Sequence, residues 1–240
     1  MKNKKVIIIS ILVILILIVG FLIYNFLTKE DKITTLNLFE KQWIESNKNN
    51  VIDMSIIDGI PILSYNGEGI IVDFLNSLNK ETNLSFNKIS YKLGDEVKSD
   101  YAFKLVDNVE DDNILIYEDN YVLVTKKETY LTIEELDNLT VGVLNENLNN
   151  INNYLHNANV SYKTFETEEE LINDFNSDKT TLNAIALLKT TNLKQLIDNN
   201  YKIAYNISDY KKYYVLDLGE TEKLNTILTK YYKKWASNNY

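Results

Sequence analysis

The sequence predicts an α/β protein with a mainly parallel sheet, preceded by one N-terminal transmembrane helix. From residue 132 onward, short apolar runs alternate with amphipathic runs of helical period, which is typical of βαβ units and a parallel sheet. Residues 6–27 carry no charged side chain. The hydrophobic content of the 240 residues is 45%, which is ample for a packed core and argues against wholesale disorder.

The apolar run at residues 6–27 is long enough to span a membrane, because a hydrocarbon core about 30 Å thick needs about 20 apolar residues. A secretory signal has a shorter core and ends at a small-residue cleavage site, which is not visible here. Lysines dominate residues 1–5, whereas the segment 29–32 is balanced in charge. The positive-inside rule therefore predicts a single-pass signal anchor in the cell membrane. Residues 1–5 would be cytoplasmic and the bulk of the chain extracytoplasmic; a buried core helix is the alternative.

The segment 28–49 is predicted to be a juxtamembrane helix and linker. Its helix, at 34–47, carries an apolar face of Leu36, Phe39, Trp43 and Ile44. Asp73 is a good N-cap, so a helix is expected over 74–83. Apolar and β-branched runs predict strands in this half at 51–57, 84–91, 101–106 and 114–125.

The second half of the chain has a more regular pattern. Thr132 and Thr167 each begin a capping box, which predicts a helix directly after each of them. Further helices are expected at 147–157, at 191–199 and from Thr221 onward. Strands are expected at 141–144, 160–165, 183–188, 202–207 and 213–218. The last helix carries a core-facing stripe of Leu224, Ile227, Leu228, Tyr231 and Trp235.

Composition excludes several classes of function. The chain has no Cys, one His and a net charge of -9. The negative charge argues against a nucleic-acid partner. His156 lies in a polar segment and is expected at the surface, so no Ser-His-Asp relay can be named. The acidic residues from Glu110 to Asp119 lack EF-hand spacing and predict a solvated loop. We therefore expect no enzyme, no catalytic residue, no metal site and no cofactor.

Residues 51–91 run from a strand through a loop with Pro61, Gly67 and Gly69 to Asp73, a helix and a second strand. This order resembles the opening lobe of bacterial type II periplasmic or extracellular solute-binding proteins of the amino-acid-binding class (family 3-like). Residues 136–144 resemble that family's entry to its second lobe. Residues 167–185 resemble its "Glu-x-x-x-x-Leu … Asp-Ala-Ile" element. The resemblance covers about residues 50–236.

The resemblance implies a two-lobed, periplasmic-binding-protein-like (type II) fold that closes on its ligand by hinge motion. The first lobe would comprise residues 50–120 and 206–240, and the second lobe residues 121–205. Two family features are missing. The family grips the ligand's α-carboxylate with an Arg, and this chain has none. The acid that holds the ligand's amine would fall near Leu188 or Lys189, where no acid stands. Both departures argue against an amino-acid ligand.

The resemblance also implies a function. The chain would be a membrane-tethered domain, held through residues 6–27, that captures a small polar or aromatic molecule for an ABC-type importer or a sensor system. Its partner would be a transporter permease, a sensor kinase or a cyclase. The candidate ligand contacts are Tyr65, Glu68, Asp119, Tyr121, Asn145 and Glu146. The last two follow a strand at its carboxyl end, which is a usual ligand position in open α/β sheets.

The alternative function is a protein-interaction or structural module with a vestigial cleft. Such a module would belong to a larger signalling or transport assembly, or would be a fragment of a tandem sensor protein. The missing Arg and the missing amine-binding acid motivate this second hypothesis.

Overall fold

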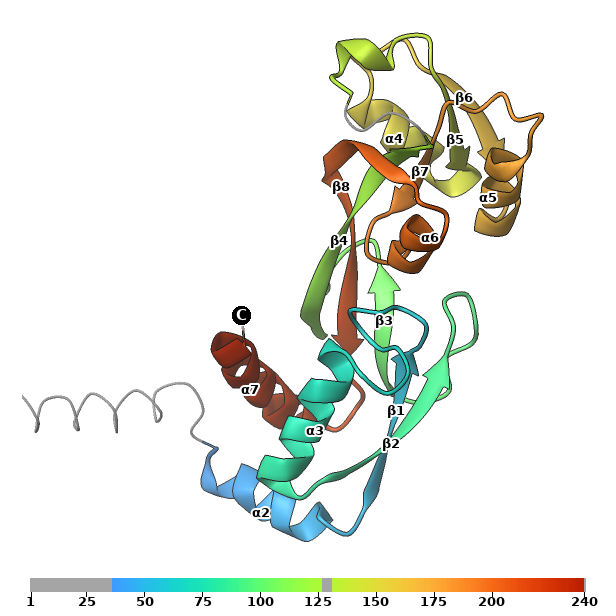
Figure 1. The fold of residues 1–240 in the computed structure, drawn as a ribbon. Helices are drawn as coiled ribbons and strands as arrows, with labels where there is room; N and C mark the ends of the chain where they lie inside the picture. Colours follow the sequence, from blue (N-terminus) through green and yellow to red (C-terminus); the bar gives the residue numbers. More distant parts are fainter. Residues whose placement is uncertain (1–35, 127–130, 240) are drawn as a thin grey trace, which may run out of the picture.

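The computed structural model describes residues 36–126 and 131–239, which form two lobes joined by two long strands (Figure 1). The first lobe contains α2 (Leu38–Asn47), β1 (Val51–Ile57), α3 (Ile70–Thr82), β2 (Ser85–Tyr91), β3 (Tyr101–Val106) and α7 (Glu222–Asn239). The second lobe contains η1 (Glu134–Leu136), β5 (Thr140–Leu144), η2 (Asn145–Asn147), α4 (Leu148–Tyr154), β6 (Ser161–Phe165), α5 (Glu168–Asn176), β7 (Ala184–Leu188) and α6 (Leu193–Asp198). The strands β4 (Asn113–Thr125) and β8 (Lys202–Asp217) run through both lobes.

The predicted membrane span at residues 6–27 lies outside the described residues. Within residues 36–126 and 131–239, no helix combines the length and the apolar character needed to cross a bilayer.

One eight-stranded sheet runs through the described part of both lobes, in the order β2-β1-β3-β8-β4-β7-β5-β6. β1 pairs in parallel with β2 and β3, and β5 pairs in parallel with β6 and β7. β4 and β8 pair antiparallel with each other and with their outer neighbours. The predicted α/β class is confirmed. The sheet is mixed, because its parallel order holds within each lobe and is broken by the two connecting strands.

The two strands predicted at 202–207 and 213–218 are one continuous strand, β8. Ser208 and Asp209 are exposed and resemble a loop in sequence, yet β4 continues to pair with β8 on both sides of them. The pairing shifts register at three places along β4, one of them between Asn120 and Tyr121. The polar segment of β8 therefore marks the solvated junction between the lobes and not a chain reversal.

The cores of the two lobes are separate. In the first lobe, α3 and α7 pack with β1, β3 and the near ends of β4 and β8 in one cluster. In the second lobe, Tyr121 and Leu123 of β4 pack on the side of α4, whereas Val122 and Val124 pack on the side of α5 and α6. Successive residues of a strand point to opposite faces, so this alternation gives the second lobe a core on each side of its sheet.

The start of α3 differs from the prediction. Asp73 is not the N-cap, because the helix begins at Ile70 and Gly69 caps it with a φ of 118°. The first two helical amides donate to the carbonyl oxygens of Ile62 and Leu63 at 3.0 and 3.1 Å. The preceding loop thus supplies the acceptors that a capping side chain normally provides. A local sequence pattern does not reveal that arrangement.

The segment after Thr132 also differs from its predicted helix. Glu135 accepts a hydrogen bond from the backbone amide of Thr132 at 2.7 Å, but only a 3₁₀ turn, η1, follows. By contrast, Thr167 caps α5 as predicted, with its hydroxyl accepting from the Glu170 amide.

The helix α2 begins at Leu38, later than predicted, and turns a different face inward. Phe39 was expected on the apolar face but is 69% exposed. Glu40 is instead the buried residue, at 2% exposure, while Trp43 and Ile44 pack against the first-lobe core. The Glu40 carboxylate accepts two hydrogen bonds from the Lys230 ammonium of α7, at 2.7 and 2.8 Å. This ion pair selects the buried face of α2 and attaches the helix to the lobe.

We expect Lys230→Met to lower the free energy of unfolding by about 2 kcal/mol, measured by urea denaturation. Breaking a fully buried ion pair costs about 3–5 kcal/mol, whereas an exposed pair contributes about 1 kcal/mol or less. The Lys230 side chain is 32% exposed, so water can partly solvate Glu40 after the change. The double variant Glu40→Gln/Lys230→Met should recover most of the loss, because Gln still accepts from the Asn37 amide. If both variants lost the same free energy of unfolding, the loss would come from packing of the Lys230 side chain and not from the ion pair.

The same pair has a defined pH dependence. Burial opposes ionisation of Glu40, but hydrogen bonds from Lys230 and Asn37 outweigh it and hold the pKa of this carboxyl below its ordinary value of 4.5. A lowered folded-state pKa adds stability above pH 4.5 that is lost as the pH falls through the folded value. The stability difference between the natural chain and Glu40→Gln should therefore shrink below pH 4.5.

Candidate functional site

A cavity of about 120 Å³ lies where the two lobes meet. We call it the interlobe cavity. Its walls come from both lobes: Leu93, Leu105, Tyr121, Leu144, Glu146, Glu168, Ala186, Leu187, Leu188, Thr191 and Lys212. Leu93 follows β2, and Leu144 and Leu188 end β5 and β7. The cavity thus lies at the carboxyl ends of parallel strands from both lobes, where open α/β sheets bind ligands.

Tyr121 is the most enclosed polar group of the interlobe cavity, at 4% exposure. Its ring stacks on Tyr210, with centroids 4.5 Å apart and planes 8° apart. Its hydroxyl has no hydrogen-bond partner among the described residues. Burial raises the pKa of this hydroxyl, and the charges of Glu146 and Glu168 add to the shift. Tyr121 therefore brings to the cavity wall a hydroxyl that is unpaired within the described residues and lies in the field of nearby carboxylates.

Glu168 places a half-buried carboxylate at the cavity wall. It is the first residue of α5, directly after the N-cap Thr167. Its Oε2 accepts one hydrogen bond from Asn192 at 3.1 Å. Burial raises the pKa of Glu168, and the bond from Asn192 only partly opposes that shift. No lysine of the described residues pairs with it, so the carboxylate lacks a counter-ion.

Lys212 is the only lysine that lines the interlobe cavity in the described chain, and it links the lobes. Its ammonium lies 3.4 Å from a carboxylate oxygen of Asp107, which follows β3 in the first lobe. It lies 3.5 Å from a carboxylate oxygen of Glu146, which follows β5 in the second lobe. The Lys212 side chain is 16% exposed, but both acids are mostly exposed. Each pair therefore contributes about 1 kcal/mol or less.

Asp119, one of the predicted ligand contacts, is buried on β4 directly opposite Lys212. Its carboxylate accepts from the amides of Thr190 and Thr191 at 2.8 and 2.7 Å, and from the Thr191 hydroxyl at 2.8 Å. The Thr191 hydroxyl also lies 2.5 Å from the Tyr214 hydroxyl. Asp119 is thus engaged within the chain, where it attaches the turn after β7 to the strands that join the lobes.

Tyr65 and Glu68 close a hairpin turn in the loop between β1 and α3. Their backbones exchange hydrogen bonds of 2.9 and 3.0 Å, and the two residues between them have positive φ, as in a type I′ turn. Glu68 is exposed and Tyr65 is half-buried. The turn does not line the interlobe cavity.

The remaining predicted contacts are neighbours with different surroundings. Asn145 is exposed and donates to a carboxylate oxygen of Glu166, outside the cavity wall. Glu146 lines the cavity. Of the six predicted residues, the structure brings Tyr121 and Glu146 together in the cavity. Sequence reasoning missed Glu168, Thr191 and Lys212, although Glu168 follows a strand at its carboxyl end as Glu146 does.

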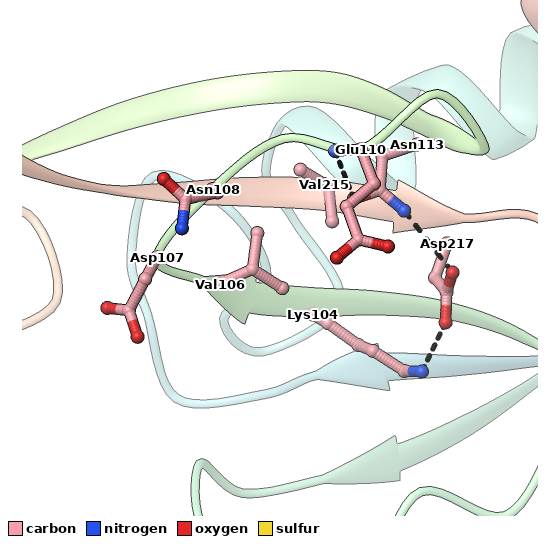
Figure 2. A pocket seen from close by; sticks show the side chains of 8 residues that line it. All are labelled: Lys104, Val106, Asp107, Asn108, Glu110, Asn113, Val215 and Asp217. Atoms are coloured by element: carbon pink, nitrogen blue, oxygen red, sulfur yellow. Dashed lines mark hydrogen bonds and ion pairs between the residues drawn. The ribbon is translucent and has the colours of Figure 1, made fainter.

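A larger hollow of about 330 Å³ lies on the first lobe (Figure 2). Figure 2 shows Lys104 and Asn113 pointing toward Asp217, which binds both of them. The Glu110 amide donates to Asn113 at 3.2 Å. No second-lobe residue lines this hollow, and its Lys104, Asn113 and Asp217 side chains already bind one another. We therefore place the candidate site in the smaller interlobe cavity, which unites both lobes.

Within residues 36–126 and 131–239, no group of three His, Cys, Asp or Glu side chains is arranged to hold a metal ion. His156 is exposed, as predicted, with Nδ1 2.5 Å from the Asn153 carbonyl oxygen.

Two α/β lobes, two antiparallel connecting strands and a cavity between the lobes define the periplasmic-binding-protein-like fold. The sequence matches no protein-family model and no curated protein. Solved structures do match. The periplasmic VFT2 domain of BvgS from Bordetella pertussis is 16% identical, with a TM-score of 0.59, covering 82% of this chain and 92% of that one.

Two further structures are similar. The substrate-binding protein of an amino acid ABC transporter is 16% identical, with a TM-score of 0.55, covering 79% of this chain and 95% of that one. AbpA from Streptococcus pneumoniae, an amino acid ABC transporter substrate-binding protein bound to L-arginine, is 15% identical, with a TM-score of 0.53, covering 82% of this chain and 93% of that one. These likenesses confirm the predicted periplasmic-binding-protein-like fold.

Proposed function

We propose that this chain is a solute-binding domain that takes one small molecule into the interlobe cavity. The observation that carries the proposal is Tyr121, a buried side chain that lines a cavity built by both lobes and whose hydroxyl has no partner among the described residues. A ligand that hydrogen-bonds this hydroxyl gains affinity, since a neutral hydrogen bond contributes about 0.5–1.5 kcal/mol. Two of the similar proteins bear names of substrate-binding proteins, which supports binding over catalysis.

The proposal extends to the setting of the domain. Residues 6–27 would anchor the domain in the membrane, with residues 1–5 inside the cell and 28–49 leading into the first lobe. The lobes would comprise residues 50–120 with 206–240, and residues 121–205. A transporter permease or a sensor protein would receive the signal of lobe closure. The name of one similar structure, the substrate-binding protein of an amino acid ABC transporter, supports a transporter partner.

We do not expect this chain to bind L-arginine, the ligand of AbpA. The chain has no Arg to grip an α-carboxylate with two parallel hydrogen bonds. The cavity of about 120 Å³ is also below the range of about 300–1,000 Å³ that is usual for ligand pockets. Both features favour a ligand smaller than arginine.

Thermal unfolding of the full chain in mild detergent tests the proposal against amines, amino acids, sugars, nucleosides and aromatic acids. A ligand at about 100 times its Kd adds about 2.7 kcal/mol, which raises the Tm by roughly 5–10 °C for a domain of this size. Tyr121→Phe should weaken binding by about 2–10-fold, since a neutral hydrogen bond contributes about 0.5–1.5 kcal/mol. Tyr213→Phe, outside the cavity wall, is the matched control. A cooperative transition that no compound shifts would overturn the proposal.

The second candidate is an interaction module whose cleft no longer binds a solute. Lys212 favours it, because its ammonium already lies between Asp107 of the first lobe and Glu146 of the second. The lobes then approach each other without a ligand. Crosslinking in intact cells tests this alternative, and failure to recover a protein partner would contradict it.

A further inference from the structure

The charges around the interlobe cavity are unequal. Glu146 and Glu168 line it, Asp107 stands at its edge, and Lys212 is its single described cation. Lys212 lies near Asp107 and Glu146, which leaves Glu168 without a counter-ion. The pKa of Tyr121 is raised by burial first, and then by Tyr210 and by all three of these carboxylates. The field inside the cavity is therefore negative.

We infer that the interlobe cavity binds a small aliphatic amine in its protonated form, without a carboxylate group, an inference that rests on the proposed solute-binding function. The ammonium donates to the carboxylate of Glu168 and to the hydroxyl oxygen of Tyr121. The alkyl chain lies against the leucine walls.

The free hydrogen-bond acceptors of the cavity match an ammonium better than the other polar groups of small ligands. An ammonium has three donors and no acceptor. Oε2 of Glu168 accepts from Asn192, and its other oxygen has no donor among the described residues. The Tyr121 hydroxyl is likewise without a partner there. A neutral ligand would leave the Glu168 charge uncompensated, and an anion would be repelled by three carboxylates.

The size and the walls of the cavity define the rest of the ligand. A cavity of about 120 Å³ is close to the roughly 150 Å³ that holds a benzene molecule. Its apolar lining consists of Leu93, Leu105, Leu144, Ala186, Leu187 and Leu188. A linear or branched amine of four or five carbons suits this space. An α-carboxylate would have to displace the two acids that already surround Lys212.

A series of compounds with one shared alkyl chain tests the ligand class by calorimetry on the full chain. The probes are butylamine, butan-1-ol, butanoate and norvaline, which is butylamine with a carboxylate on the amine-bearing carbon. We expect butylamine to bind at least tenfold more tightly than the other three. Tighter binding of norvaline, butanoate or butan-1-ol would overturn the amine inference and leave the solute-binding proposal intact. No binding by these probes or by the wider panel would overturn both.

Glu168→Gln tests the residue that carries the inference. Gln keeps the size of the side chain and the oxygen that accepts from Asn192, but removes the charge. Butylamine affinity should fall at least tenfold, whereas Glu170→Gln, on the exposed side of the same helical turn, should change it less than twofold. The Tm of Glu168→Gln without ligand should not fall, because burial disfavours the charged carboxylate. Unchanged butylamine affinity in Glu168→Gln would overturn the inference.

Discussion

Asp119→Ala is expected to lower the free energy of unfolding by about 3–5 kcal/mol. The Asp119 carboxylate accepts three hydrogen bonds from Thr190 and Thr191, at 2.7–2.8 Å, in a buried position. A hydrogen bond to a charged group contributes about 1.5–3 kcal/mol, and the three bonds share one carboxylate, so their contributions are not additive. The substitution leaves three donors of the turn without their acceptor. Thr191 lines the interlobe cavity, so any ligand response should be lost as well.

Urea denaturation followed by circular dichroism measures this effect, with the midpoint falling and the slope unchanged. Glu118→Ala is the matched control, since Glu118 is the preceding residue of β4 and its carboxylate binds Lys211 at the surface. An exposed pair of this kind contributes about 1 kcal/mol or less. A loss for Asp119→Ala no larger than that of Glu118→Ala would contradict the structural role of the buried carboxylate.

Gly69→Ala is expected to lower the free energy of unfolding by about 3 kcal/mol or more. Gly69 has a φ of 118°, which side chains rarely adopt, and an added Cβ would lie 2.5 Å from the Leu63 carbonyl oxygen. That oxygen belongs to the backbone and accepts from the Ile71 amide at 3.1 Å, so it cannot move without breaking the start of α3. Backbone strain of this kind costs about 1–3 kcal/mol before the clash is counted.

Gly67→Ala is the control for the conformational part of this effect. Gly67 also has a positive φ, of 83°, but a Cβ there meets no atom within 4 Å. Gly67→Ala should therefore lower the free energy of unfolding by about 1 kcal/mol. The difference in unfolding free energy between the two variants then measures the cost of the close approach to Leu63. Equal melting temperatures for the two variants would show that the contact with Leu63 has no energetic weight.

Much of the fold could be predicted because hydrophobic periodicity is a local property of the chain. The strands β1, β2, β3 and β5, the helix α5 with its cap at Thr167, and the apolar stripe of α7 all lie where their patterns predict them. Two of the errors occur where a partner outside the segment overrides the local pattern. The helix α3 begins at Ile70 because loop carbonyls accept its first two amides, and β8 continues through a polar segment because β4 pairs with it.

The candidate site was predicted less completely than the fold. Tyr121 and Glu146 were selected by their positions near a strand crossing and a strand end, and both line the cavity. Lys212 carries no local signal, because it stands in a polar strand among other lysines. Glu168 stands in the first turn of α5, where the helix dipole favours an acid without any ligand. Only the approach of the two lobes distinguishes these residues from ordinary surface charges.

The residue pattern alone was sufficient for the α/β class, most helix and strand positions, and the exclusion of thiol and multi-histidine chemistry. When one face of a helix or strand is buried, its apolar residues recur with a fixed period, and that period can be read from the segment alone. Tertiary structure decided which charges meet. Thr190 binds Asp119 from 71 positions away, and Lys212 lies between acids of two lobes. Such pairs depend on strand order and register across the whole sheet, and no local pattern of residues encodes them.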